Sequence, residues 1–470
     1  MLRLRLMFLI LVALISGCAS APKSNLFPDD EAQCVSELSE YYRSVEASRG
    51  YALPYHFDGR FPYLAFDRFS TSMTDTLSGA AAKKQWLDYV SRLGKEQLEI
   101  ALKLTPKPAG AVNLTQCQQA LTAKSLNNAA FWQIVQEQPP RVPTAYQHWK
   151  RVVGVYPVAS LVAEGRIEAE QVRIKESFRR VLESPVSYGE PASRLVQAEI
   201  AGMLSAARQQ SPTGWPLINE DDEVRLLNHY SPIFKVETLT RDDLPGALEL
   251  GRGDKPYINT FKPALYKHLS YTRFDGNVLP QLNYVLWFPG RPAASVFDPY
   301  AGRFDAVNVR ITLDESGQPL ILDSIHQCGC YHMVYLLSDT IGFRHLDGEK
   351  PIEQTLLLPQ PSPRLTVSLT SGEHMIQGVS VTGNTSPDVA LAGLPLKSTL
   401  ALPTVGQTFQ SPYDREGILP ESVRGERWFL WPFGVRSPGA MRQHGKHAIA
   451  FVGERHFDDA HLFDFLLIRR

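Results

Sequence analysis

Residues 307–332, VNVRITLDESGQPLILDSIHQCGCYH, predict the architecture of the second half of the chain. Apolar residues alternate with polar ones from Val307 to Leu313, which is the period of a strand with one buried face. The residues Asp314–Gly317 are typical of a turn, and a second apolar run returns the chain through Leu320 and Leu322. We therefore expect a β-hairpin that leads directly into a segment rich in histidine and cysteine.

Similar short runs occur on both sides of this hairpin. From about residue 211 onward, prolines and glycines separate runs of β-branched and aromatic residues, which is typical of antiparallel strands. The clearest runs are 282–288, 365–369, 375–381, 448–452 and 461–468. We expect residues 211–470 to form an antiparallel β-sandwich or open barrel, with a loop-rich excursion at 382–425. We place the aromatic segment Trp428–Phe433 in the core or at a seam between domains.

The first half of the chain has a helical period instead. Apolar residues recur three and four positions apart in the stripes Cys34–Val45, Leu87–Ala101 and Leu114–Leu121. Further helices are expected at 144–155, 167–182 and 192–208. The pattern predicts an all-helical domain over residues 31–210, and so an α+β chain overall.

The chain begins with Arg3 and Arg5, an apolar run from Leu6 to Ile15, and the sequence Ile15-Ser16-Gly17-Cys18. A positive start, a short apolar core and small residues before a cysteine resemble the signal peptide and lipobox of bacterial lipoproteins. The resemblance covers only about the first twenty residues. The apolar run is too short to span a bilayer permanently, which also favours a cleaved signal.

This resemblance implies a location for the protein. It implies removal of residues 1–17 and lipid attachment at Cys18, with residues 18–30 as a tether. The expected partner is then a lipid bilayer, held through acylated Cys18. Ala19 implies sorting to the outer membrane, with the body of the protein facing the periplasm.

Composition excludes one class of partner. The chain has 470 residues with 48 Lys and Arg against 49 Asp and Glu, a formal net charge of −1. A charge so close to zero gives no argument for binding nucleic acid. A protein partner in the cell envelope is compatible with this composition, although no motif identifies it.

The expected compartment predicts the oxidation state of the cysteines. In an oxidising space thiols tend to form disulfides, which leaves four cysteines to pair once Cys18 carries lipid. The economical pairing joins Cys34 to Cys117, both on inward faces of expected helices. Cys328 and Cys330 are then left to each other or to a ligand.

The segment from His326 to His332 concentrates metal-binding and nucleophilic side chains. On a strand, His326, Cys328, Cys330 and His332 would all point to one face. The outer pair would stand about 20 Å apart on a straight strand, too far to share one ion. Either Gly329 bends the chain sharply, or only two or three of the four act together.

Three interpretations follow from these residues. In the first, the two cysteines and one or both histidines bind a soft or borderline metal ion such as zinc or copper. In the second, Cys328 and Cys330 form a structural or redox-active disulfide. In the third, Cys328 or Cys330 is a catalytic nucleophile and His326 or His332 is its base.

Other polar residues are weaker candidates. His444, His447, His456 and His461, with Asp458 and Asp459, could complete a metal site or support its ligands. Asp298 and Asp305 flank a polar loop and suit acid–base work or a turn. No serine-hydrolase elbow, zinc-protease motif, phosphate loop or dinucleotide-binding motif is present in the sequence.

The sequence thus predicts an outer-membrane lipoprotein whose His-x-Cys-x-Cys-x-His segment is a redox or metal-binding site. The alternatives are a metal- or thiol-dependent envelope hydrolase and a structural envelope protein that uses the cysteines as a staple.

Overall fold

A computed structural model describes most of the chain after the expected signal. The described residues are 26–27, 29–48, 50–107, 112–178, 180–191, 193, 195–359, 363–381 and 386–470. The expected signal peptide, Cys18 and most of the tether therefore lie outside the described residues. The α+β class is confirmed, with helices concentrated in the first half and strands in the second.

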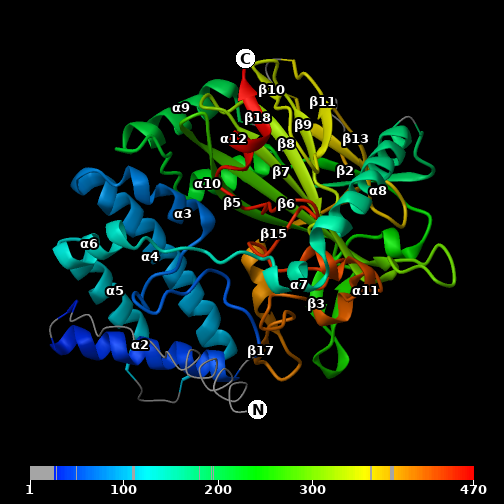
Figure 1. Cartoon of the computed structure of the whole chain (residues 1–470). Coiled ribbons are helices and arrows are strands. Elements are labelled where there is room, and N and C mark those ends of the chain that lie inside the picture. Colours follow the sequence, from blue (N-terminus) through cyan, green and yellow to red (C-terminus); the bar gives the residue numbers. More distant parts are fainter. Residues whose placement is uncertain are drawn as a thin grey trace, which may run out of the picture.

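The helices between residues 29 and 137 form a group on one side of the molecule, whereas α7 (His148–Val153) and α8 (Tyr156–Ser177) lie on the other side (Figure 1). The main members of the group are α2 (Asp29–Ser48), α4 (Gly79–Leu104), α5 (Leu114–Ser125) and α6 (Ala129–Glu137). Side chains of Asn113 and Asn128 cap the N-termini of α5 and α6, because each accepts a hydrogen bond from a backbone N–H in the first turn. The apolar stripes expected from the sequence face one another and form a shared core.

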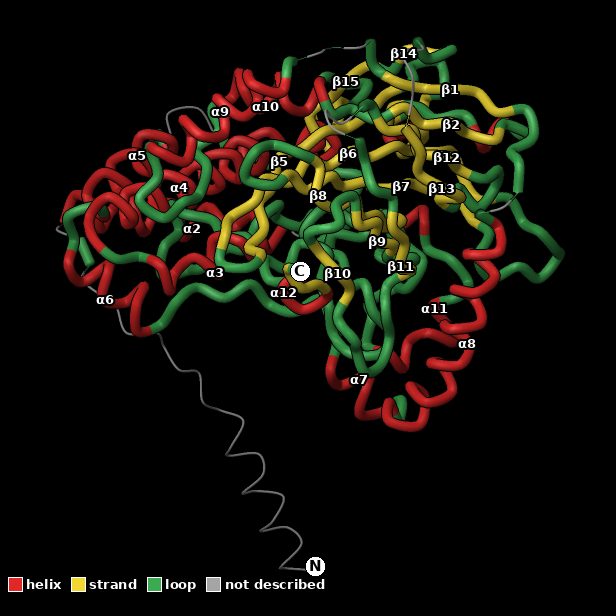
Figure 2. Tube along the Cα trace, turned by 90° about the horizontal axis from the view of Figure 1, so that it is seen from above, coloured by secondary structure: helices red, strands yellow, loops and turns green. Residues whose placement is uncertain are grey.

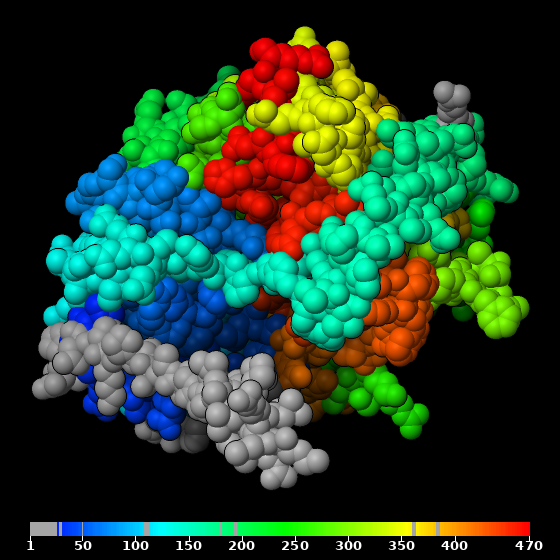
Figure 3. Space-filling view, viewed as in Figure 1, coloured from blue at the N-terminus to red at the C-terminus, as the bar shows by residue number. Residues whose placement is uncertain are grey.

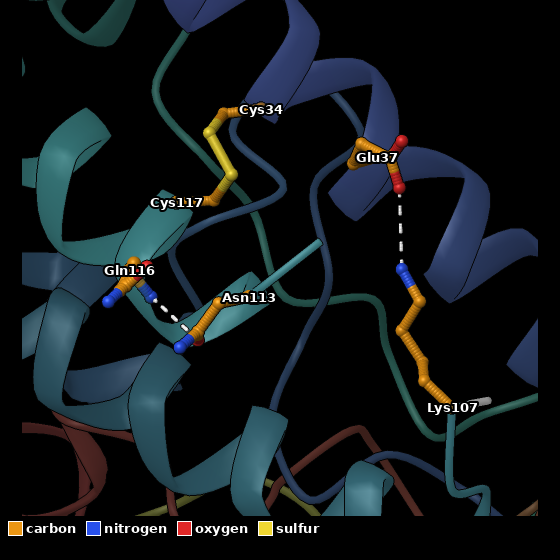
Figure 4. Close-up of a disulfide and its surroundings, with 6 residues drawn as sticks. All are labelled: Cys34, Glu37, Lys107, Asn113, Gln116 and Cys117. Carbon is orange, nitrogen blue, oxygen red and sulfur yellow. Dashed lines mark hydrogen bonds and ion pairs between the residues drawn. A yellow bond between two sulfur atoms is a disulfide. The ribbon is translucent and has the colours of Figure 1, made fainter. Parts of the chain in front are cut away.

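A disulfide joins two of these helices, as the sequence predicted. Cys34 of α2 and Cys117 of α5 have Cα atoms 5.2 Å apart and are bonded through their sulfurs (Figure 4). The same view shows Lys107 in an ion pair with Glu37 of α2, 3.3 Å apart. Both contacts fix α2 against the chain that leads into α5.

The second half is built on a seven-stranded sheet in the order β11-β9-β8-β7-β6-β5-β15. Its strands are β5 (Ala264–Phe274), β6 (Asn277–Arg291), β7 (Gly302–Leu313), β8 (Pro319–His326), β9 (Met333–Leu336), β11 (Ile352–Thr355) and β15 (Ala392–Pro395). The expected hairpin is confirmed as β7–β8. Its turn is stabilised by the Asp314 carboxylate, which accepts hydrogen bonds from the backbone of Ser316 and Gln318.

A five-stranded sheet lies beside it in the order β13-β12-β2-β1-β14. Its strands are β13 (Ile376–Val381), β12 (Leu365–Leu369), β2 (Ile233–Glu237), β1 (Pro185–Gly189) and β14 (Val389–Ala390). The expectation of purely antiparallel strands is wrong for both sheets. β12 pairs parallel with β2, β1 with β14, β11 with β9 and β15 with β5. None of these pairs is joined by a tight hairpin that would force an antiparallel arrangement, and even β9 and β11, which are close in sequence, have β10 (Ile341–Phe343) between them.

The remaining elements surround the two sheets. The helices are α3 (Arg68–Ser72), α7 (His148–Val153), α8 (Tyr156–Ser177), α9 (Gln197–Gln209), α10 (Glu220–His229), α11 (Arg427–Leu430) and α12 (Leu462–Leu466). The short strands are β3 (Ala247–Leu250), β4 (Pro256–Asn259), β10 (Ile341–Phe343), β16 (Leu402–Pro403), β17 (Phe409–Gln410) and β18 (Leu467–Arg469). The 3-10 turns are η1 (Met73–Thr76), η2 (Arg241–Asp243), η3 (Arg252–Asp254), η4 (Leu396–Leu400), η5 (Pro420–Ser422) and η6 (Trp431–Phe433).

Two late strand predictions are wrong. Residues 448–452 have no regular strand, and only a single bridge joins Ala448 to His456. The run 461–468 begins as α12 and becomes β18 at Leu467. Among the described residues, no helix is long and apolar enough to cross a membrane.

The two faces of the seven-stranded sheet differ in polarity. Val307, Val309 and Ile311 of β7 belong to the main apolar core. On the opposite face, a buried polar row crosses four strands, because His268, Asn283, Arg310 and Asp323 lie directly opposite one another in register. The polar face of the hairpin is therefore covered, chiefly by the segment that contains Phe457, whose carbonyl accepts a hydrogen bond from Arg310 at 2.5 Å.

Candidate functional site

The cysteine segment forms a sharp turn between β8 and β9. The N–H of His326 donates to the carbonyl of Cys330 at 3.0 Å, and the N–H of Gly329 donates to the carbonyl of His326 at 2.7 Å. Gly329 has φ +91°, and a Cβ atom there would overlap the carbonyl oxygen of Ala448. Glycine is thus required twice at this position, by its backbone angle and by the lack of space.

This bend separates the four expected ligands. His326 Nδ1 lies 3.6 Å from Asp305 Oδ1, whereas His332 Nε2 lies 3.3 Å from Asp323 Oδ2. Cys328 and Cys330 hydrogen-bond to each other. Within the described ranges, no group of three or more His, Cys, Asp or Glu is arranged to hold a metal ion. The geometry therefore does not support the four-ligand zinc or copper site.

The two cysteines form an unequal pair of free thiols. Cys328 is buried, while Cys330 is partly exposed. The hydrogen bond from Cys330 lowers the pKa of Cys328, and Arg424 adds to this effect against burial and the charge of Glu426. The same hydrogen bond, together with burial, raises the pKa of Cys330. The first proton to leave the pair therefore leaves its negative charge on the buried Cys328.

Neither flanking histidine acts on these thiols in this structure. His326 and His332 are turned to Asp305 and Asp323, and the charged side chains that shift the two cysteine pKa values are Glu426, Arg424 and Arg442. A base must reach the proton that it removes. The contacts therefore do not favour a Cys–His nucleophile at this turn.

His326 instead ends a buried chain of charged groups. His374 Nδ1 lies 2.9 Å from Asp305 Oδ2, and His374 Nε2 lies 3.5 Å from Asp243 Oδ1. Arg424 also reaches Asp305, at 3.3 Å. Burial would raise the pKa of Asp305, but Arg424, His326 and His374 hold it well below its usual range. Hydrogen bonds to Asp243 and Asp305 raise the pKa of His374 against the effect of burial.

Sequence reasoning missed most of this chain of groups. Asp305 was considered only as a partner of Asp298, which instead accepts hydrogen bonds from the backbone of its own loop. Asp243, His374 and Arg424 come from separate parts of the sequence, and no spacing links them to the cysteines. The only local signal was that Asp305 lies just before the apolar run of β7.

His332 belongs to a different buried group. Arg310 holds Asp323 with two hydrogen bonds of 2.8 and 2.5 Å, and its guanidinium stacks 3.6 Å above the ring of Phe457. Burial lowers the pKa of His332, although Asp323 opposes this change. The two histidines of the motif are thus fixed on opposite sides of the turn.

Cys330 opens into a large apolar groove. The groove has a volume of about 760 Å³, and Cys330, Tyr331 and His332 line it together with one face of α8. Helix α8 lies on the far side of the sheets from α2 and α5 (Figure 2). In the space-filling view, the α7–α8 segment lies against the segment that contains α11 (Figure 3). The groove therefore brings the cysteine turn and the segment Trp428–Phe433 together.

The aromatic segment is only partly buried. Phe433 is buried, but Trp428 is 71% exposed and Phe429 is 48% exposed. Phe429 and Phe433 line the groove, so the expectation of a core or seam is correct only for part of the segment. Exposed aromatic rings beside an apolar groove are typical of surfaces that bind another molecule.

Glu426 brings an ionisable group to the same groove. Burial raises its pKa to about 7, against the nearby positive charges of Arg424, Arg291 and Arg442. It lines the groove with Cys330 and influences the pKa of both thiols. A carboxyl group with this pKa can accept or donate a proton at neutral pH.

The remaining histidines do not complete the cysteine site. His456 accepts a hydrogen bond from the N–H of Ala145 at 2.9 Å, and His461 contacts Asp464 at 3.0 Å. His447 reaches only the carbonyl of Gln327, at 3.2 Å. The ring of His444 lies 5.0 Å from that of His268, on the polar face of the sheet.

Comparison of the chain with protein-family models, with curated protein sequences and with solved structures found no match.

Proposed function

We propose that the protein is an envelope lipoprotein that exchanges thiols and disulfides with a polypeptide bound in the groove beneath α8. The observation that carries this proposal is the unequal thiol pair, in which Cys330 lines the groove and Cys328 lies buried behind it. Two adjacent thiols, one of them accessible, can carry out a two-step exchange, and the thiolate of Cys328 can take the proton of Cys330 and so offset the raised pKa of that thiol.

The exchange would proceed in two steps. The proton of Cys330 passes along its hydrogen bond to the thiolate of Cys328. The sulfur of Cys330 then attacks a disulfide of the bound polypeptide, which forms a mixed disulfide and releases one substrate thiolate. The released thiolate takes the proton back from Cys328. The thiolate of Cys328 then attacks the sulfur of Cys330 and releases the second substrate thiolate. The pair loses two electrons and two protons, and the two substrate sulfurs gain them. In the reverse direction the oxidised pair introduces a disulfide.

The groove suits an extended polypeptide with apolar side chains. Val158, Val162 and Phe429 line it and are largely exposed. Apolar side chains of a bound segment would remove this surface from water, at about 25 cal/mol per Å². Glu426 would take up or release the proton that Cys330 exchanges at neutral pH.

A redox titration tests this proposal. Purified protein is equilibrated in glutathione buffers of known ratio, and free thiols are counted by alkylation and mass spectrometry. We expect Cys328 and Cys330 to titrate together as a two-electron couple. Cys330→Ser should abolish reduction of a disulfide-containing test peptide, and Cys328→Ser should trap the mixed disulfide. A pair that stays fully reduced or fully oxidised at every ratio contradicts the proposal.

The same purified protein can be used to distinguish metal binding at Cys328 and Cys330 from thiol exchange. Elemental analysis is carried out on the wild type and on the double variant Cys328→Ser/Cys330→Ser. Stoichiometric zinc or copper that is lost in the variant would replace the redox proposal with a metal site completed by side-chain movement. The double variant Cys34→Ala/Cys117→Ala serves as the matched control, because it removes two cysteines far from the turn.

We also propose that the protein is anchored to the outer membrane by lipid on Cys18, with its body in the periplasm. The support is the run of Arg3, Arg5, Leu6–Ile15 and Gly17 before Cys18. Labelled palmitate should enter the wild type but not Cys18→Ala, and fractionation should then release the variant from the outer membrane. Equal labelling of both proteins would contradict the anchor.

We further propose that the two sheets pack as the layers of a β-sandwich. The support is a shared core, in which Phe234 and Val367 of the smaller sheet join Leu286 and Val309 of the larger one. Hydrogen exchange should then give similar opening free energies for β2, β12, β6 and β7. Separate, lower protection of the smaller sheet would contradict a common core.

A further inference from the structure

A second large cleft lies away from the cysteine groove. It has a volume of about 710 Å³ and is lined from the helical half by residues such as Tyr51 and Tyr55, and from the C-terminal half by residues such as Arg436 and Lys446. A smaller cavity of about 60 Å³ shares Tyr55 and Lys446 with it and continues toward the sheet, where Ser270 and Gln281 line it. The two together form a polar recess between the halves of the molecule.

The lining of this cleft is strongly basic. Five basic side chains line it, namely Arg68, Arg415, Arg436, Arg442 and Lys446, against the two acidic side chains Glu46 and Glu416. Glu416 is engaged by Arg436 at 2.5 Å and by Arg415 at 3.5 Å. Arg68 is paired with Asp458, at 3.3 Å. These ion pairs account for three of the five positive charges.

The other two positive charges lack a carboxylate partner. Arg442 is only 2% exposed, and its guanidinium donates to the backbone carbonyls of Cys328, Arg436 and Ser437. No side-chain hydrogen bond or ion pair joins Lys446 to any residue that the structure describes, and the carboxylate with the largest effect on its pKa is that of Asp458. A buried positive charge without a counter-ion is costly unless an anion completes the site.

Burial is the main influence on the charge of Lys446. Burial lowers the pKa of Lys446, and Arg68 lowers it further, although Asp458 and Glu416 act in the opposite direction. Burial also lowers the pKa of Lys150, to which Arg436 and Arg442 contribute. An anion placed beside Lys446 would favour its charged form against the effect of burial.

The walls of the cleft add apolar surface. Tyr51, Tyr55 and Phe57 are partly exposed and line one side. At the inner end, the small cavity is bounded by His268, whose neighbour across the sheet is Asn283. His444 also lines this cavity, and its Nδ1 atom is buried without a hydrogen-bond partner among the described residues. Such atoms need water or polar groups of a ligand.

We propose that this cleft binds a small organic oxyanion, a phosphate or carboxylate that carries a ring. The oxyanion lies between Arg442 and Lys446, and the ring packs against Tyr51, Tyr55 and Phe57. Guanidinium and ammonium groups together recognise such oxygens by charge-assisted hydrogen bonds. The site is distinct from the groove of the thiol exchange, because it uses neither cysteine side chain and opens on the cleft between the two halves.

Calorimetric titration of the full chain with phenyl phosphate, benzoate and inorganic phosphate tests the proposal. We expect phenyl phosphate or benzoate to bind with a dissociation constant that weakens at least tenfold in Lys446→Gln and recovers in Lys446→Arg. Inorganic phosphate should bind more weakly than phenyl phosphate, because it lacks the ring. Higher salt should weaken all binding, since the attraction is ionic.

The control is Lys262→Gln, which removes an exposed lysine that pairs with Glu249 far from the cleft. Thermal unfolding of each variant establishes that it is folded, and added ligand should raise the midpoint only where binding persists. Binding to neither organic probe, or equal affinity in Lys446→Gln and Lys262→Gln, overturns the proposal. Arg436→Gln provides a second variant if Lys446→Gln does not fold.

Discussion

The two cysteine pairs of this protein differ in almost every physical respect. Cys34 and Cys117 are 83 residues apart in sequence and are joined across two helices. Cys328 and Cys330 are separated by one residue and remain thiols on a turn between two strands. Both pairs belong to one chain and one compartment, so the difference must come from loop length and local environment.

The two pairs would close loops of different length, and therefore would stabilise the folded state by different amounts. In the chain-entropy model, closing a loop of 83 residues stabilises the folded state by about 4.5 kcal/mol, whereas a loop of three residues gives only about 1.5 kcal/mol. The first pair is therefore effective as a staple. The second contributes little by closing, which leaves it available for reversible chemistry.

The electrostatic surroundings differ as well. Near the staple, Glu37 and Lys107 form an ion pair at a partly exposed site. Near the thiols, Arg424 and Glu426 are both buried and act directly on the cysteine pKa values. Buried charges interact more strongly than exposed ones, because less water screens them.

The largest expected effect comes from breaking the staple. Cys34→Ala/Cys117→Ala should lower the free energy of unfolding by about 3–5 kcal/mol, because the unfolded chain gains freedom. Cys328→Ala/Cys330→Ala should lower it by less than about 2 kcal/mol, since only small buried groups are lost. Urea denaturation followed by circular dichroism measures both. A larger loss for the second double variant would reverse the assignment of roles.

A smaller loss is expected at the turn that holds the thiols. Gly329→Ala should destabilise the protein by about 2–4 kcal/mol, because the backbone angle is unfavourable and the new methyl group overlaps the carbonyl of Ala448. It should also slow the pairing of Cys328 with Cys330 in the redox titration, while the staple stays closed.

Gly453→Ala is the matched control for this change. Gly453 has φ +88°, close to that of Gly329, but a Cβ there meets nothing within 4 Å. Gly453→Ala should lower the free energy of unfolding by only about 1–2 kcal/mol, which comes from the unfavourable backbone angle alone. Equal losses for both variants would show that crowding at Ala448 plays no part in shaping the turn.

The sequence predicted the staple more fully than the thiol site, and the reason is physical. Cys34 and Cys117 each lie on a helical stripe, and the helical period alone turns them inward. For Cys328, the strand period also predicted the shared face, but the turn at Gly329 ends the strand. The sharp bend that a four-ligand site would need is present, with positive φ at both Gly329 and Tyr331, but it directs His326 to Asp305 and His332 to Asp323.

The parallel strand pairs and the buried chain of ionisable groups could not be predicted, because they depend on contacts between segments far apart in the sequence. The parallel pairs β1–β14, β12–β2 and β15–β5 join distant segments, and local alternation carries no information on which segments meet. The same holds for the chain of Asp243, His374 and Asp305, which only the folded sheets bring together. The expected hairpin succeeded because its register follows from adjacent residues and one turn.

The smallest of the three effects concerns the carboxyl group next to the thiols. Glu426 has a pKa of about 7 in the folded protein, raised from its ordinary value of 4.5 by burial. The folded state therefore binds a proton more tightly than the unfolded chain, so the stability that Glu426 contributes is complete below pH 4.5 and is lost as the pH rises through 7. The glutamine of Glu426→Gln does not titrate, so the variant does not lose this stability as the pH rises.

Glu426→Gln should consequently gain stability relative to the wild type by about 2–3 kcal/mol between pH 4.5 and pH 8. Urea denaturation at the two pH values measures the gain.

Removing the negative charge should also speed alkylation of Cys328 and Cys330 at pH 8, because Glu426 raises the pKa of both thiols. Glu37→Gln, beside the staple, should change stability by only about 0.5 kcal/mol, as its ion pair is partly exposed. If the two glutamine variants behaved alike at both pH values, the contrast between a buried reactive pair and an inert staple would lose its electrostatic basis.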